Sequence, residues 1–171
     1  MDNHFLLFQM PVSFDIDIGQ LDAAFRELQG RVHPDRFVAA SDAEKRVAMQ
    51  WATRANEAYQ TLKHPLKRAA YLCELNGVDL GIESNTAMPP AFLMQQMAWR
   101  EALDEARDAK DAGALERLES ELAGMRRERL AQIGNLFSER QFEAAGAQVR
   151  QLMFLEKFGE DVGRAFDAID A

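Results

Sequence analysis

Apolar side chains recur at helical spacing along most of the chain. From residue 18 to residue 32 they stand three or four positions apart, the interval that places them on one buried face of an α-helix. They are Ile18, Leu21, Phe25, Leu28 and Val32. Clean two-residue alternation occurs only in VSFDIDI, residues 12–18, which is flanked by Pro11 and Gly19 and is interpreted as a loop. The pattern therefore predicts an all-α fold.

Start and stop signals define the elements of the first half. After a short helical turn over residues 4–9, we predict helices over 18–32, 41–63 and 65–75. Asp17 and Ser41 precede the first two, each followed three residues later by Gln or Glu, which is a capping pattern. Pro65 suits a first helical turn, and Asn76-Gly77 suits a helix end. We expect the second of these helices to bury Val47, Trp51, Ala55, Ala58 and Leu62.

The second half begins after a change of composition. Residues 78–89 contain Gly, Ser, Asn, Thr and Pro and are predicted to form a linker. Helices are then expected over 90–110, 114–137 and 138–159, the last interrupted at Gly159 and resuming up to residue 169. These three would form an antiparallel bundle. The predicted domains are residues 1–77 and 90–171.

Composition narrows the functional classes. The formal net charge of −8 argues against general binding to nucleic acid or to an anionic membrane. A single cysteine, Cys73, precludes an internal disulfide and favours a reducing compartment. The chain has no apolar run long enough to cross a membrane, and its first residues do not resemble a signal peptide. We expect a cytoplasmic protein, with the local basic group Arg126, Arg127 and Arg129 on a solvated helix face.

Catalytic and metal-binding patterns are not found in the sequence. His4, His33, His64 and Cys73 do not have the spacing of metal ligands. The chain also has no glycine-rich phosphate loop and no nucleophile elbow. We therefore expect a protein that is not an enzyme and that needs no metal or cofactor.

The tripeptide His33-Pro34-Asp35 lies between two predicted helices. A residue before proline is driven out of the helical region, so the preceding helix must end at His33. Three interpretations are open: a helix terminator, a catalytic histidine, or a rigid loop that another protein recognises. A short exposed carboxylate on a stiff loop is a good partner for an arginine of another protein, and this favours recognition.

The bundle carries more large apolar residues than its core needs. Phe92, Trp99, Leu103 and Ala106 form one face of the first bundle helix, and Leu93, Met94 and Met97 lie on nearly the opposite side. The last helix has a core face of its own, and Phe154 points away from it. This face is formed by Ala145, Val149, Leu152, Leu155 and Phe158. Either these residues are covered by another part of the chain or a second copy, or they form a binding surface with Glu101, Asp104 and Glu105 at its edge.

Several blocks of sequence resemble a known family. HPDRF followed by ANEAYQTLKHPLKRAAYL is similar to the J-domain of DnaJ-type co-chaperones. HPLKRAAYLCELNG, AFLMQQMAWREALDEA and VRQLMFLEKF, in this order, resemble the HscB branch of those co-chaperones. The resemblance covers essentially the whole chain.

The resemblance implies a J-domain, a C-terminal three-helix bundle and two protein partners. The first partner would be HscA, a DnaK-class chaperone whose ATP hydrolysis the J-domain stimulates through His33, Pro34 and Asp35, with Arg26, Arg31 and Arg36 guiding the encounter. The second would be the iron–sulfur scaffold IscU. The positions implied to hold the scaffold are Leu93, Met94, Met97, Glu101, Glu105 and Phe154.

The chain departs from the family pattern in its charges. The helix before the loop is usually strongly basic, but here it carries few arginines and Gly30 near its end. Gln95 and Ala98 stand where relatives often have glutamate. We expect a monomer; the alternatives are a J-domain protein for another folded client and a structural homodimer that uses the same apolar residues.

Overall fold

The computed structural model describes residues 3–81 and 88–170, which divide into two compact units, Met1–Leu72 and Cys73–Ala171. The helices are α1 (His4–Leu7), α2 (Ile18–Val32), the 3₁₀ helix η1 (Pro34–Phe37), α3 (Asp42–Lys63), α4 (Pro65–Leu75), α5 (Pro90–Asp108), α6 (Ala112–Ser138) and α7 (Phe142–Asp170). The described residues contain no strand, so the all-α prediction is confirmed. Of the predicted linker, residues 82–87 lie outside the described part of the chain.

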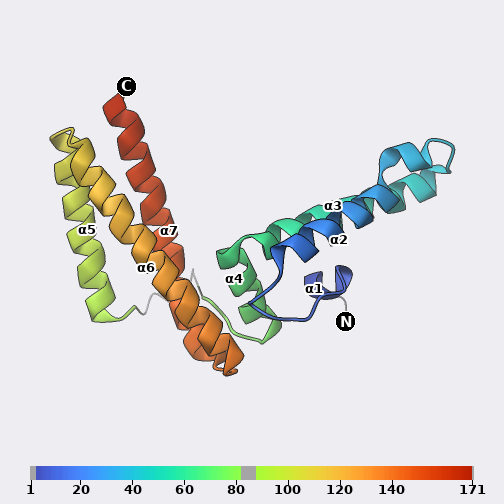
Figure 1. Cartoon of the computed structure of the whole chain (residues 1–171), viewed down its shortest axis with the longest axis horizontal. Helices are drawn as coiled ribbons and strands as arrows, with labels where there is room; N and C mark the ends of the chain where they lie inside the picture. Colours follow the sequence, from blue (N-terminus) through green and yellow to red (C-terminus); the bar gives the residue numbers. More distant parts are fainter. Residues whose placement is uncertain (1–2, 82–87, 171) are drawn as a thin grey trace. The chain divides into compact units, whose positions relative to one another are not determined.

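The first unit is built on the hairpin of α2 and α3, which run side by side in Figure 1 with η1 at the turn between them. Both predicted caps are present: the side chain of Asp17 accepts the Gln20 amide, and that of Ser41 accepts the Glu44 amide. Midway along α2, the Phe25 ring stacks on Tyr59 of α3, with 4.1 Å between the centroids.

Burial along α3 differs between its two halves. Ala55, Ala58 and Leu62 are buried as predicted, but Val47 and Trp51 are exposed, which corrects the predicted buried face. The reason is the length of the hairpin. The half of α3 next to η1 has only α2 and η1 to pack against, so its apolar side chains are not covered on all sides, whereas α1 also contacts α3 in the same unit.

The second unit contains the bundle of α5, α6 and α7, in which every pair of helices is in contact. All the predicted core residues of α5 and α7 are buried. Helix α7 runs from Phe142 to Asp170 without interruption, so the predicted break at Gly159 is wrong. A glycine costs a helix about 1 kcal/mol. Burial of Val162 and Ala165 beyond it outweighs that cost.

The segment after α4 packs on α7 within the second unit. Val78 is buried, and a Cβ atom at Gly146 would lie only 2.7 Å from its Cγ1 atom. A glycine is therefore required at residue 146 for this close approach, and the first part of the predicted linker is in fixed contact with the bundle.

The predicted solvated face of Arg126, Arg127 and Arg129 is only partly correct. Arg127 is exposed, but Arg126 pairs with Glu156 at 2.7 Å. The Arg129 guanidinium lies over the Phe92 ring, 5.0 Å from its centroid, and donates to the side chains of two glutamines of α7, Gln148 and Gln151. Burial lowers the pKa of Arg129. This arginine therefore braces α6 against the start of α5 and the middle of α7.

Candidate functional site

The loop between α2 and α3 is held by its own histidine. His33 has an extended backbone (φ −63°, ψ 136°), as a residue before proline requires. Its Nδ1 atom accepts the backbone N–H of Asp35 at 3.2 Å and so caps η1, in which Pro34 occupies the first position. Because Nδ1 serves as an acceptor, the neutral imidazole carries its proton on Nε2. His33 therefore shapes the loop.

Asp35 is the exposed acid of this loop. Its side chain is 89% exposed, and its Oδ2 atom lies 3.6 Å from His33 Nδ1, beyond hydrogen-bonding distance. A carboxylate in this position retains free acceptor sites, which a partner's guanidinium could occupy with two hydrogen bonds.

The three arginines expected to guide a partner do not form one basic face. Arg31 pairs with Glu27 at 2.6 Å, and both side chains are 67% exposed. Arg26 is five positions away from Arg31, which separates the two by about 140° around α2. Arg36 is exposed on η1, next to Asp35. The positive field around the loop is thus weak and divided between α2 and η1.

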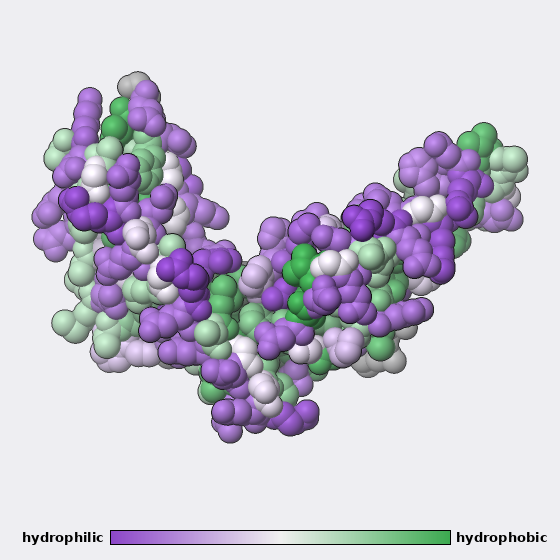
Figure 2. Space-filling view, viewed as in Figure 1, coloured by the Kyte–Doolittle hydropathy of each residue, from purple (hydrophilic) through white to green (hydrophobic). Residues whose placement is uncertain are grey.

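The surplus apolar residues of the bundle, for which coverage by another part of the chain was the alternative, are exposed. Leu93 and Phe154 are each 44% exposed, Met97 is 72% exposed and Met94 is 70% exposed. Figure 2 shows hydrophobic colouring over the part of the bundle where α5 begins. Among these residues, Leu93, Met97 and Phe154 line one groove between α5 and α7, with a volume of about 890 Å³, whereas Met94 does not line it.

The groove has an apolar part and an acidic part. Its floor is formed by Trp99 and Phe158, whose nearly parallel rings have centroids 5.9 Å apart. Both side chains are also part of the buried core, so the floor is rigid. The acidic residues of α5 that line the groove are Glu101, Asp104, Glu105 and Asp108. On α7 the wall adds Lys157.

Arg100, Asp108 and Lys157 also line this groove, and sequence reasoning missed them. Asp108 and Arg100 could have been found from helical spacing, because each lies within one turn of Asp104 on the same face of α5. Lys157 gave a weaker signal, since a charged residue on an outer helix face is usually only solvated. Gln96 lines the groove as well and was also not predicted, whereas Glu101 and Glu105 were.

Metal binding has no visible basis in the described residues. Between residues 3–81 and 88–170, no three His, Cys, Asp or Glu side chains are grouped so that they could hold a metal ion. Within the same ranges no helix is long and apolar enough to cross a membrane.

The chain is similar to known proteins over almost its whole length. Residues 88–163 match the family model of the HSCB C-terminal oligomerisation domain. A co-chaperone protein HscB homolog from Burkholderia thailandensis is 56% identical over 169 residues, which cover 99% of this chain and 97% of the homolog. This chain belongs to the HscB family of co-chaperones.

Solved structures of HscB proteins have the same fold. HscB from Vibrio cholerae superimposes with a TM-score of 0.86 at 38% identity, covering 98% of this chain and 99% of that one. Human HscB gives a TM-score of 0.90 at 28% identity, covering 95% of this chain and 81% of the human chain. The resemblance noted in the sequence is therefore confirmed for the family and for the fold class.

Proposed function

We propose that this HscB-family chain stimulates the ATPase of the DnaK-class chaperone HscA and delivers the iron–sulfur scaffold IscU to it, which assists the assembly and transfer of iron–sulfur clusters. In this proposal residues 1–77 form the J-domain, residues 78–89 form the linker and residues 90–171 bind the scaffold. The observation that carries the scaffold part is the exposed apolar groove with an acidic wall between α5 and α7.

The loop would act on the chaperone's active site without chemistry of its own. Asp35 would receive an arginine of the chaperone, while His33 and Pro34 keep the carboxylate projecting from the turn. Arg26, Arg31 and Arg36 would guide the encounter. Because they form a weak and divided field, the contact would depend mainly on Asp35 and less on long-range attraction.

The groove would bind the scaffold through its apolar part first. Burying one large apolar side chain contributes about 1.5–3 kcal/mol, so Leu93, Met97 and Phe154 together could support a micromolar complex after the cost of association. Met94 would lie at the margin of this contact. Glu101 and Glu105 would favour a partner segment with basic residues next to apolar ones.

The proposal is tested by the variant Asp35→Asn in a single-turnover ATPase assay with HscA. Stimulation should be lost, because the amide cannot form a charged pair with a guanidinium, while the affinity for IscU should stay unchanged. Asp42→Asn serves as the matched control, since Asp42 is an exposed aspartate of the same unit. Full stimulation by Asp35→Asn would refute the assignment of the loop.

Self-association through the same groove is a second candidate, because the matched family model is described as an oligomerisation domain. A symmetric pairing would bring two acidic walls together, and like charges across an interface oppose association. Sedimentation velocity over a wide range of concentrations distinguishes the candidates. A concentration-independent monomer supports scaffold binding, and a dimer that Phe154→Ala dissociates supports self-association.

A further inference from the structure

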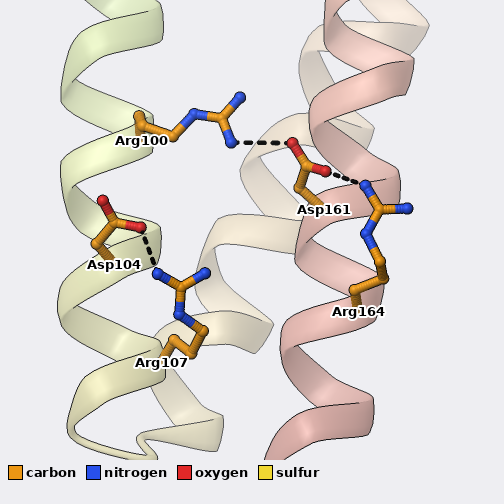
Figure 3. A network of polar contacts seen from close by, with 5 residues as sticks. All are labelled: Arg100, Asp104, Arg107, Asp161 and Arg164. Carbon is orange, nitrogen blue, oxygen red and sulfur yellow. Dashed lines mark hydrogen bonds and ion pairs between the residues drawn. The ribbon is translucent and has the colours of Figure 1, made fainter.

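A charged contact joins α5 to α7 beside the groove. Arg100 of α5 donates from Nη1 to the Asp161 carboxylate of α7 at 2.9 Å. Its guanidinium lies over the Phe158 ring, 5.3 Å from the centroid. On its other side Asp161 is paired with Arg164, so one carboxylate holds two arginines, as Figure 3 shows. Arg100 and Phe158 both line the groove.

The bridge is less solvated than an ordinary surface ion pair. The Asp161 side chain is only 20% exposed, although that of Arg100 is 57% exposed. Partial desolvation raises the pKa of Asp161, but the hydrogen bonds from Arg100 and Arg164 outweigh it and leave this pKa below its usual range. The carboxylate thus stays ionised at neutral pH, and its position fixes that of the Arg100 side chain.

The alternative partner of Arg100 lies on the groove wall. Asp104 is one turn away on α5 and is held by Arg107 at 2.8 Å in the same helix. A released Arg100 could reach Asp104, since side chains four positions apart on a helix are neighbours. It would then leave the Phe158 ring uncovered and place its charge on the acidic wall.

We propose that Arg100 and Asp161 are positioning residues for the groove: their bridge joins the α5 and α7 walls and keeps the Arg100 charge away from the acidic residues. This inference rests on the proposed scaffold-binding function. It predicts that both partners of the bridge are needed for scaffold affinity, although they carry opposite charges.

A purely electrostatic effect predicts something different. If the groove only attracted a basic partner, Arg100→Met would strengthen binding and Asp161→Asn would weaken it. If the bridge shapes the groove, each single variant weakens binding by about 3- to 10-fold. The double variant then loses no more affinity than the single variant with the larger loss, because the two residues act as one unit. The opposite charges of the two side chains thus separate the explanations.

The experiment is isothermal titration calorimetry of IscU with the full chain and these variants. Arg126→Met is the matched control, because it breaks an interhelical arginine–carboxylate pair, Arg126–Glu156, outside this groove, and its affinity should change less than 2-fold. Arg100→Lys should recover part of the affinity lost in Arg100→Met, since lysine keeps the charge but not the planar contact with Phe158. A general loss of structure would not be reversed in this way, and thermal unfolding of each variant checks the fold.

Each outcome decides the proposal. Weaker binding by both single variants with a non-additive double variant supports it. Two results overturn it and leave the proposed function intact, provided that the unmodified chain binds IscU. One is that Arg100→Met and Asp161→Asn change the affinity in opposite directions, and the other is that Arg100→Met leaves the affinity unchanged. If the unmodified chain does not bind IscU, the proposed function fails and this inference fails with it.

Discussion

Two methionines of α5 offer a close test of the groove. Met94 and Met97 are three positions apart and almost equally exposed, at 70% and 72%, but only Met97 lines the groove. Truncation to alanine should not harm the helix, since alanine is at least as good a helix former as methionine. Any difference between Met94→Ala and Met97→Ala in scaffold binding therefore reports the position of the groove.

The size of the effect follows from the exposed surface. Full burial of a methionine side chain contributes about 1.5–3 kcal/mol. Because Met97 has about seven-tenths of its surface still to bury, its truncation should cost about 1–2 kcal/mol, or roughly 5- to 30-fold in Kd. Met94→Ala should cost less than about 0.6 kcal/mol, roughly a 3-fold change, because residues at the rim of an interface contribute little.

The assay is isothermal titration calorimetry of each variant with IscU at one salt concentration. Thermal unfolding of the same samples should show unchanged stability for both. Equal losses of affinity for the two variants would contradict the assigned position of the groove. A larger loss for Met94→Ala would place the contact on the other edge of α5.

Three other predictions concern stability and reactivity. Gly146→Ala should lower the melting temperature of the chain and cost about 1–3 kcal/mol of stability, because its Cβ atom would meet Val78. Gly159→Ala should raise the melting temperature, because a Cβ atom there would have no neighbour within 4 Å and alanine is the better helix former. Equal shifts of the two melting temperatures in calorimetry would contradict the packing described for Gly146. Burial raises the pKa of Cys73 to about 11, so iodoacetamide at pH 8 should label the native thiol far more slowly than the unfolded one, as mass spectrometry would show. The Tyr59 hydroxyl donates to Asp22 at 2.6 Å and is the main cause of this carboxyl's lowered pKa. A lowered pKa stabilises the fold above the unfolded value of 3.8 and loses this effect as the pH falls through the folded value. Tyr59→Phe should therefore destabilise the chain more at pH 7 than at pH 3, and equal destabilisation in urea titrations at both values would refute this reading.

Local signals were sufficient to predict most of the fold. The caps at Asp17 and Ser41 depend only on neighbouring residues, and the structure has both. The three- and four-residue spacing of apolar residues predicted helix α2, but of its predicted buried face only Leu21 is fully buried and Ile18 is exposed. The end of the last helix depends instead on burial. Gly159 looked like a stop, but tertiary packing of the residues after it keeps the helix intact.

The turn between α5 and α6 shows a second limit. Residues 111–113 were predicted to separate the two helices, yet α6 begins at Ala112 with the Asp111 side chain as its cap. The residue with positive φ at this turn is Lys110, at 51°. A lysine in the left-handed region gives no signal in sequence, since most non-glycine residues avoid it.

The candidate surfaces were predictable in part. The exposure of Met97 and Phe154 follows from a helix that has more apolar residues than one buried face can hold. The bridge between Arg100 and Asp161 could not be predicted, because the two residues are 61 positions apart and meet only once α5 packs beside α7. The same is true of Arg129, whose contact with Phe92 requires the packed bundle.

The central claim is that one chain must engage the chaperone and the scaffold at the same time. It is tested most directly by scaffold-dependent stimulation of the HscA ATPase with an equimolar mixture of two variants. One is the loop variant Asp35→Asn, and the other is the groove variant, which carries both Met97→Ala and Phe154→Ala. If delivery requires both surfaces in one molecule, the mixture should give no more scaffold-dependent stimulation than the groove variant alone. Recovery of the stimulation given by the unmodified chain would show that the two surfaces can act from separate molecules and would contradict the account.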